Sequence, residues 1–246
     1  MVRAAILADI HINLEAFQAV LQDVERRGGV DEVWCLGDVV GYGPDPQECI
    51  ALLRKGLYEC IAGNHDWAAT GKIDTSLFNP YAEAATQWTR QQLAEEEVGF
   101  LNQLPLQVCK DDFTLVHGSP RDPIWEYVLS EAVALASLEH FETPYCLVGH
   151  SHIPFICQLD ESSVRCVFRE FPEEKPVKLQ GERLIINPGG VGQPRDGIPT
   201  SSYAIYDSSE GTICRYRVSY DIPKTQEKMR KAGLPEQLIT RLSYGR

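Results

Sequence analysis

The chain has 246 residues, 43% of them apolar and 24% charged, so it is long enough to bury a large core and has the composition of a globular protein. Its formal net charge of −12 argues against binding to a nucleic-acid backbone, which relies on clustered lysine and arginine. No apolar stretch approaches the roughly 18 residues of a membrane-spanning helix, so no membrane partner is expected.

The N-terminus and the cysteines predict a cytoplasmic protein. Asp9 interrupts the first apolar run before the core of a signal peptide could form. None of the eight cysteines forms a C-x-x-C pair, and several lie inside apolar runs, so reduced, structural cysteines are expected. The sequence leaves the oligomeric state undetermined, and a homo-oligomer stays open.

The first third of the chain predicts strands that alternate with helices. Asn13 is suited to cap the first helix and Gly28 to end it, while Pro46 is suited to open the second. An alternation of this kind predicts βαβ units and a largely parallel sheet. The expected elements are strands at residues 4–8, 32–36 and 58–62 and helices at residues 14–27 and 46–55.

The sequence pattern changes in the second half of the chain, where short predicted strands are separated by turn residues. This pattern predicts a mainly antiparallel arrangement after residue 152. The expected elements are helices at residues 82–103 and 131–139, a helical stretch at 224–242 that Gly233 and Pro235 interrupt, and strands at 106–110, 113–117, 145–148, 155–159, 165–171, 184–187, 202–207 and 211–218.

Polar residues recur directly after the predicted strands, and five of the six histidines lie in these loops. The carboxyl ends of strands in an open α/β sheet meet at one edge, where ligands bind, so side chains far apart in sequence should lie together. His140, inside a predicted helix, is the exception and is given no role. The clusters are Asp9-Ile10-His11, Gly37-Asp38, Gly63-Asn64-His65-Asp66, His117-Gly118 and Gly149-His150-Ser151-His152.

The residue types in these clusters favour a metal site. Neutral imidazole and carboxylate oxygen bind manganese, iron, zinc or nickel, and the lack of cysteine argues against a structural zinc site. In Asp-x-His and His-x-His, alternate residues of an extended segment face the same side and can reach one ion.

These motifs, in this order, resemble the calcineurin-like metallophosphoesterases. The family pattern D-x-H, G-D, G-N-H-D, a lone His and G-H-x-H occurs between Asp9 and His152. The glycine-rich run at residues 187–195 is similar to a stretch of small prokaryotic members. The resemblance implies an α/β fold in one domain over residues 1–246: a sandwich of two central β-sheets flanked by helices, its first half βαβ and its second half mainly antiparallel.

The resemblance also implies two divalent metal ions per chain, with Mn²⁺ favoured over Fe, Zn or Ni. His65 is the candidate general acid, and Asp66 either orients His65 or caps the next helix. Arg121 and Arg195 are candidates for binding the substrate phosphate. The implied ligands are Asp9, His11 and His152 for one ion, Asn64, His117 and His150 for the other, and Asp38 as a bridge between them.

The implied reaction is hydrolysis of a small or nucleotide-like phosphate ester by a hydroxide that bridges the two ions, as in a phosphodiesterase or phosphatase. A diadenosine polyphosphate hydrolase, a phosphoprotein phosphatase and a non-catalytic protein-binding scaffold are the alternatives. The phosphoprotein phosphatase is disfavoured because Gly41 and Tyr42 stand where those enzymes carry Asp and Arg. The scaffold is disfavoured because every expected metal ligand is present.

Overall fold

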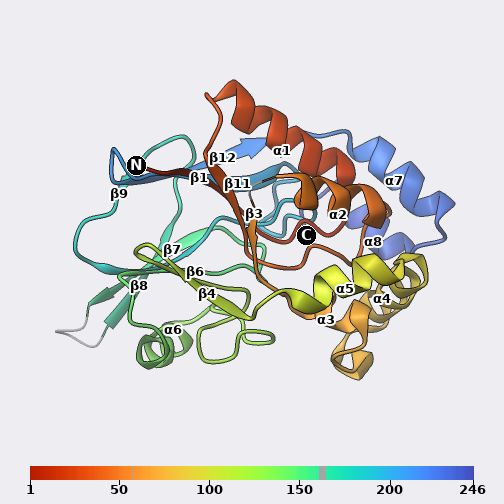
Figure 1. Cartoon of the computed structure of the whole chain (residues 1–246), viewed down its shortest axis with the longest axis horizontal. Coiled ribbons are helices and arrows are strands. Elements are labelled where there is room, and N and C mark those ends of the chain that lie inside the picture. Colours follow the sequence, from red (N-terminus) through yellow and green to blue (C-terminus); the bar gives the residue numbers. More distant parts are fainter. Residues whose placement is uncertain (57, 161–164) are drawn as a thin grey trace.

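Two six-stranded sheets pack face to face in the computed structural model of the chain, which describes residues 1–56, 58–160 and 165–246 (Figure 1). In the first sheet, β1, β2 and β3 run parallel, and β11, β12 and β9 follow on the other side of β1, each antiparallel to the strand before it. Its strands are, in spatial order, β3 (Tyr58–Cys60), β2 (Glu32–Cys35), β1 (Arg3–Leu7), β11 (Ser201–Asp207), β12 (Thr212–Val218) and β9 (Val177–Lys178).

The second sheet is built around a parallel centre with antiparallel edges. Strands β5, β6 and β10 are parallel, whereas β4, β7 and β8 pair in antiparallel fashion. In spatial order they are β4 (Gln107–Lys110), β5 (Phe113–Val116), β6 (Tyr145–Leu147), β10 (Arg183–Asn187), β7 (Phe155–Asp160) and β8 (Arg165–Glu170). The predicted α/β class, with two central sheets and a mainly antiparallel second half, is confirmed.

Helices cover the outer faces of the sandwich. Helices α1 and α2 pack on the first sheet and α6 on the second, while α7 and α8 form a hairpin at the C-terminus. The helices are α1 (Leu14–Arg26), α2 (Pro46–Lys55), α3 (Asn64–Thr70), α4 (Pro80–Gln92), α5 (Glu95–Gln103), α6 (Glu131–Ser137), α7 (Ile222–Lys231) and α8 (Glu236–Arg241), with 3-10 turns at Thr75–Leu77 and Leu138–His140.

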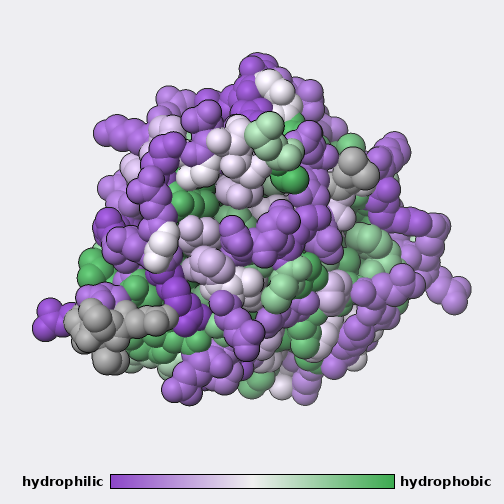
Figure 2. All heavy atoms as spheres, turned by 60° about the vertical axis from the view of Figure 1, so that its left-hand side comes forward, coloured by the Kyte–Doolittle hydropathy of each residue, from purple (hydrophilic) through white to green (hydrophobic). Residues whose placement is uncertain are grey.

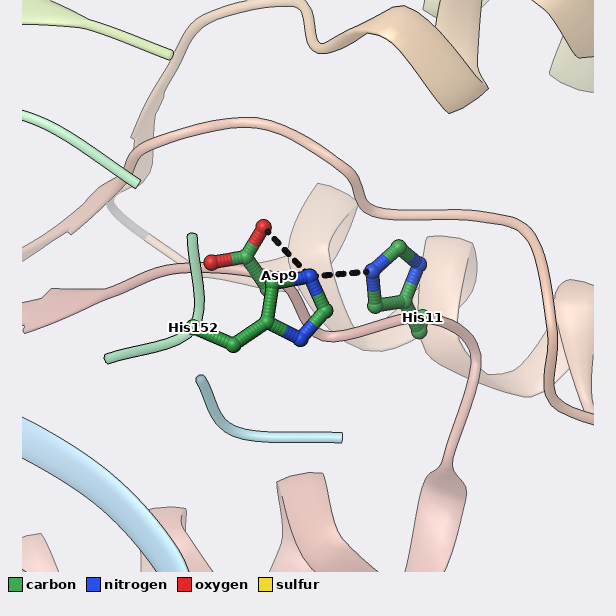
Figure 3. Close-up of side chains that lie close together, drawn as sticks. All are labelled: Asp9, His11 and His152. Carbon is green, nitrogen blue, oxygen red and sulfur yellow. Dashed lines mark hydrogen bonds and ion pairs between the residues drawn. The ribbon is translucent and has the colours of Figure 1, made fainter. Parts of the chain in front are cut away.

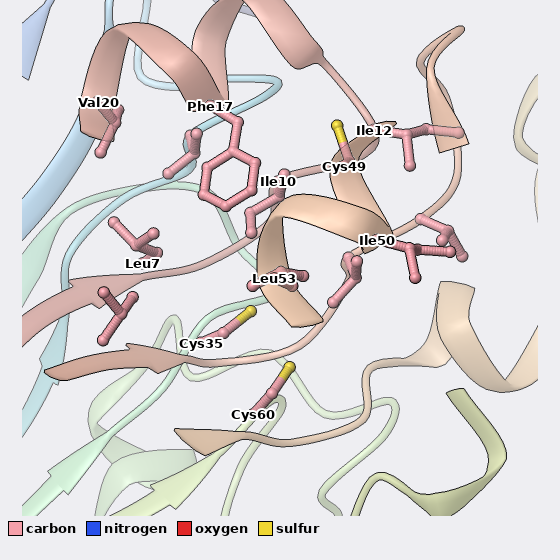
Figure 4. Close-up of a cluster of buried hydrophobic side chains, with 14 of the residues drawn as sticks. Leu7, Ile10, Ile12, Phe17, Val20, Cys35, Cys49, Ile50, Leu53 and Cys60 are labelled. Carbon is pink, nitrogen blue, oxygen red and sulfur yellow. The ribbon is translucent and has the colours of Figure 1, made fainter. Parts of the chain in front are cut away.

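Two apolar layers hold these elements in place. Between the sheets, the ring of Trp34 lies 5.3 Å from Phe113 and 5.8 Å from Tyr206, so three strands from both sheets meet there. Between the first sheet and its helices, Phe17 and Ile50 pack over the strands (Figure 4). Burying each such side chain contributes about 1.5–3 kcal/mol, so these layers fix the strand ends that carry the polar loops.

Some local predictions differ from the structure. The helix predicted at residues 82–103 is two helices, because the Glu97 carboxylate accepts a hydrogen bond of 2.7 Å from the Ala94 amide and starts α5 afresh. The sequence predicts reduced cysteines, yet Cys157 and Cys166 on neighbouring strands form a disulfide. Their Cα atoms are 6.3 Å apart, a separation set by the β7–β8 register.

A membrane-spanning helix is not found among the described residues. No helix in the described ranges is both long and apolar enough to cross a bilayer. On the face that Figure 2 brings forward, hydrophilic residues cover most of the surface and hydrophobic ones are scattered between them.

Candidate metal centre

The seven predicted metal ligands converge at the carboxyl ends of five strands. They follow β1, β2 and β3 in the first sheet and β5 and β6 in the second. Each is at most 4% exposed, although carboxylates and imidazoles are rarely buried without partners. The structure therefore brings all seven together: Asp9, His11, Asp38, Asn64, His117, His150 and His152.

The first cluster joins the loop after β1 to the loop after β6. The Nε2 atom of His152 lies 3.2 Å from Nε2 of His11 and 3.4 Å from Oδ1 of Asp9. Figure 3 shows the three side chains pointing toward one another from segments more than a hundred residues apart in sequence. Their ligand atoms all lie within 4.8 Å of one another, close enough to hold one ion.

The second cluster lies beside the first. His117 Nε2 is 3.2 Å from His150 Nδ1 and 3.3 Å from the Asn64 side-chain oxygen. Together with Asp38, the two histidines form a second group whose ligand atoms lie within 4.8 Å of one another. The two groups give two candidate positions for an ion.

Asp38 connects the two clusters. Its Oδ2 atom is 3.2 Å from His117 Nε2 and 3.8 Å from His11 Nε2, so the same oxygen faces both groups. Burial would raise the pKa of this carboxyl, but His117 and His65 beside it keep the pKa well below its usual range. Asp38 thus stays a carboxylate in the position that a bridging ligand needs.

Backbone carbonyls orient the histidine rings. The Nδ1 atoms of His11, His117 and His152 lie 3.0, 2.8 and 2.5 Å from carbonyl oxygens, and Nε2 of His150 lies 3.2 Å from another. A ring nitrogen that donates to a carbonyl leaves the other nitrogen unprotonated and free to bind metal. In each ring the remaining nitrogen is the one that faces its cluster.

The backbone around these ligands is strained. Asp9, His11, Asp38, His150 and His152 have φ between 48° and 64°, a left-handed conformation that residues with a Cβ adopt at a cost of about 1–3 kcal/mol each. The buried loops retain it because backbone hydrogen bonds hold them, such as His11 N to Asp38 O at 3.0 Å. Strain concentrated at one place is typical of functional sites.

The protonation of the site suits metal binding. Burial lowers the pKa of His11, His150 and His152, that of His150 to about 3, so these imidazoles are neutral at pH 7. Burial acts on His117 too, but the charge of Asp38 outweighs it and raises the pKa of His117 to about 9. An ion would displace that proton, because a metal-bound imidazole is neutral.

The residues of the two clusters fit a pair of metal ions, because a buried carboxylate of the site lacks partners for its negative charge. The Oδ2 atom of Asp9 is buried and has no hydrogen-bond partner in the described chain. Burial also raises the pKa of Asp9 to about 7, which shows how poorly the protein alone stabilises its charge. A divalent cation supplies the missing charge, and the oxygen and nitrogen donors suit manganese, iron, zinc or nickel.

A cavity of about 160 Å³ opens onto the clusters, and aromatic rings line much of it. The ring of Tyr127 stacks on His150 at 3.9 Å, and Phe78 lies 4.7 Å from His65 and 5.5 Å from Trp125. Asp38, Asn64 and the predicted phosphate ligand Arg195 also line the cavity. The sequence does not identify the aromatic residues, because they come from loops without a motif.

His65 lines this cavity, and its ring forms no hydrogen bond to the ligand clusters among the described residues. Its Nδ1 atom is buried and has no partner among the described residues, and its ring lies 4.4 Å from Tyr42. A Cβ on Gly41, which has φ of +91°, would stand only 2.5 Å from that Nδ1. Glycine at this position lets the ring lie close against the loop.

The other three predicted site residues lie in different places. Asp66 accepts hydrogen bonds from the amides of Gly63 (2.9 Å) and Val40 (3.0 Å), so it caps α3 and ties two ligand loops together. Arg195 lines the cavity. The structure does not bring Arg121 there, because the guanidinium is exposed and paired with the Glu126 carboxylate.

Adding metal should stabilise the protein and saturate at two ions per chain. An ion that binds only the folded state at about 100 times its Kd contributes about 2.7 kcal/mol. For a chain of this size, each kcal/mol raises Tm by about 2–4 °C, so Mn²⁺ should raise Tm by roughly 5 °C or more. Thermal unfolding and elemental analysis of the dialysed protein would measure the two effects.

The matched control is His140→Ala beside His152→Ala, since His140 is exposed and lies outside the clusters. His140→Ala should keep the full shift and two ions, whereas His152→Ala should lose part of both. Saturation at one ion, or no change in Tm at saturating metal, would contradict a preformed dinuclear site.

Comparisons with known proteins find matches across most of the chain. A protein-family model described as the calcineurin-like phosphoesterase superfamily domain matches residues 2–211. A metallophosphoesterase from Sphaerobacter thermophilus has a similar structure, with a TM-score of 0.90 and 45% identity over 100% of this chain and 99% of that one. An uncharacterized protein of Methanocaldococcus jannaschii is 40% identical over 98% of both chains.

A more distantly similar protein is an enzyme whose name states its activity. The symmetrical bis(5′-nucleosyl)-tetraphosphatase of Cronobacter sakazakii is 26% identical over 132 residues. The alignment covers 52% of this chain and 47% of that enzyme, so it spans about half of each.

Proposed function

The chain belongs to the calcineurin-like phosphoesterase superfamily, and from this premise we propose that it hydrolyses a small or nucleotide-like phosphate ester, as a phosphodiesterase or phosphatase with two divalent metal ions. The observation that carries the proposal is the single Asp38 oxygen that faces two adjacent ligand groups. Two ions, with Mn²⁺ favoured, would supply Lewis-acid chemistry that activates water and neutralises phosphate charge. Asp9, His11 and His152 would hold one, and Asn64, His117 and His150 the other.

The chain's own residues would bind and orient the ester in the cavity. Arg195 would hold a phosphate oxygen, because it is the only lysine or arginine among the described residues that line the cavity. His65 would give a proton to the leaving oxygen from its ring, which lines the cavity. The aromatic rings around the cavity would exclude water and contact the organic part of the ester.

A dinucleoside polyphosphate hydrolase is the second candidate. The partial likeness to the Cronobacter sakazakii tetraphosphatase favours it, and so do the rings of Phe78, Trp125 and Tyr127, which could stack on a base. A phosphoprotein phosphatase is supported less, because an aspartate at position 41 would collide with His65.

A substrate panel tests the proposal. Mn²⁺-loaded protein would be assayed on phosphomonoesters, phosphodiesters, dinucleoside polyphosphates and a phosphopeptide, with His152→Ala as the control for contaminating activity. We expect hydrolysis of small or nucleotide esters that the variant loses. Preference for the phosphopeptide would overturn the substrate class, and inactivity on every compound would support the non-catalytic scaffold.

A further inference from the structure

Tyr42 contacts both side chains that are proposed to handle the substrate. Its ring lies 4.4 Å from the ring of His65, and the guanidinium carbon of Arg195 lies 5.6 Å from its centroid. We propose that Tyr42 is a positioning residue, which places the phosphate-binding arginine and the general acid through the packing of its ring. This inference rests on the proposed phosphoesterase function and deepens it, because one side chain would then set both contacts with the ester.

The backbone at Tyr42 is strained. Tyr42 has φ of +61°, a left-handed conformation that is rare for a bulky residue, and glycines stand on either side of it. Glycine would adopt this conformation more readily, so the backbone alone does not account for a tyrosine at this position. Strain that a non-glycine residue retains beside a site is typical of residues whose side chain has a function.

Hydrogen bonds and apolar contacts hold Tyr42 in place. The Gly43 amide donates to the His11 carbonyl oxygen at 3.1 Å, which ties this loop to the loop after β1. Tyr42 is 6% exposed and belongs to an apolar cluster with Leu238 and Ile239 of α8. The ring therefore gives other side chains a fixed surface to pack against.

The position of His65 depends on this surface. Its Nδ1 atom is buried and has no partner among the described residues, so no hydrogen bond of that nitrogen orients the ring. Besides Tyr42, its aromatic neighbours are Phe78 at 4.7 Å and His11 at 5.0 Å. Because the contact with Tyr42 is the shortest of the three, loss of the Tyr42 ring should let His65 turn in the cavity.

Few contacts fix Arg195. Its Nη2 donates to the Gln193 side-chain oxygen at 3.0 Å, while its Nε is buried without a partner in the described chain. A cation within about 6 Å of an aromatic centroid is attracted to the ring, and the guanidinium of Arg195 meets this condition over Tyr42. This contact steadies the guanidinium and leaves N–H groups available for phosphate.

The two contacts predict two effects of removing the Tyr42 ring. A poorly placed Arg195 should weaken phosphate binding, and a displaced His65 should slow those esters whose leaving oxygen needs a proton. A simple loss of folded protein would instead lower all activities by one factor and leave their ratio unchanged. The ratio between ester classes therefore distinguishes a positioning residue from a structural one.

The experiment compares Tyr42→Leu, which removes the ring, with Tyr42→Phe, which keeps it, in the Mn²⁺-loaded protein. Tyr42→Leu should raise the Kd for orthophosphate, measured by calorimetry, about threefold to tenfold, as expected for the loss of one cation–π contact. It should lower kcat about tenfold on an alkyl phosphate ester and at most about threefold on a nitrophenyl ester. Tyr42→Phe should recover most of both losses, and metal content should stay native in both variants.

Tyr206→Leu is the matched control for removal of a buried tyrosine ring. Tyr206 is 8% exposed, but its ring packs between the sheets against Trp34 and Phe113. This variant should change neither the Kd for orthophosphate nor the ratio between the two esters.

Double variants show through which side chain Tyr42 acts. Added to Arg195→Gln, Tyr42→Leu should leave the Kd for orthophosphate within about twofold, and added to His65→Ala it should leave the ester ratio within about twofold, because contacting residues are not additive.

The proposal is overturned if Tyr42→Leu slows both ester classes equally, loses metal or keeps its full effect in the double variants. It is also overturned if Tyr42→Phe behaves like Tyr42→Leu, or if Tyr206→Leu shifts the ratio as much. Should the native protein hydrolyse no ester, the proposed function fails. Orthophosphate binding by Tyr42→Leu, with and without Arg195→Gln, then still decides whether Tyr42 positions the arginine.

Discussion

Asp38→Asn is expected to lower kcat/KM on the best substrate by at least about 100-fold, because altering partners of metal ligands already costs about 10–100-fold and Asp38 is placed as a ligand to both ions. The substitution preserves shape. The introduced amide would keep an oxygen to accept the hydrogen bond of 2.9 Å from the His65 amide, but it would remove the negative charge that faces His11 and His117.

The fold should survive this change, which separates a metal effect from unfolding. The metal-free variant should give the native far-ultraviolet circular dichroism, while its thermal shift with Mn²⁺ and its metal content both fall. Asp112→Asn, on an exposed turn residue, is the matched control and should change neither activity nor metal content. Activity of Asp38→Asn within about twofold of the native value would show that Asp38 is not the bridge.

The ligand positions could be predicted from the sequence because strand ends are a local signal. An apolar run followed by Gly-Asp or Gly-Asn-His marks where a parallel strand stops, and parallel strands end at a shared edge. Asp9, Asp38 and Asn64 are therefore placed together by topology alone, whereas His117 follows a strand of the second sheet and meets them through the packing of the two sheets. The βαβ order is equally local, and Pro46 and Asn13 mark helix starts that the structure contains.

The cavity wall could not be predicted in this way because it depends on packing between distant segments. Tyr42, which lines the cavity, belongs to an apolar cluster with Leu238 and Ile239 of α8, nearly 200 residues later in the sequence. Tyr127 is likewise recognisable only once its ring is seen stacked on His150. The Cys157–Cys166 pairing depends on strand register, which spacing alone does not set.

The loop that carries Asn64 and His65 shows a mixed case. Its motif is clear, but α3 begins at Asn64 itself and the sequence does not predict this helix, because seven residues give too short an apolar pattern. The helix matters for function: Asp66 caps it and thereby fixes His65 at the cavity. A capping role, one of the two that the sequence allows for Asp66, is the one with hydrogen bonds in the structure.

His65→Ala is expected to slow hydrolysis of alkyl phosphate esters by about 10²–10⁴-fold and of nitrophenyl esters much less, because general acid catalysis contributes that range only when the leaving oxygen needs a proton. Burial lowers the pKa of His65 to about 4 in the metal-free protein, so the free ring is neutral at pH 7. A phosphate bound beside the ring would oppose that effect, since a neighbouring negative charge favours the protonated ring. The bound substrate would thus help to protonate His65, the general acid.

Kinetics on the two ester classes separate this role from simple positioning. If His65 only orients phosphate as a neutral hydrogen-bond donor, His65→Ala should slow alkyl and nitrophenyl esters equally, and the general-acid assignment would have to be dropped. His140→Ala, the same change at an exposed histidine, should slow neither. Metal content of His65→Ala should stay at the native level, because the ring has no hydrogen bond to either ligand cluster within the described residues. A loss of metal would instead mean that His65 acts through the ions, and the contrast between ester classes would then disappear, because both depend on the same pair of metal sites.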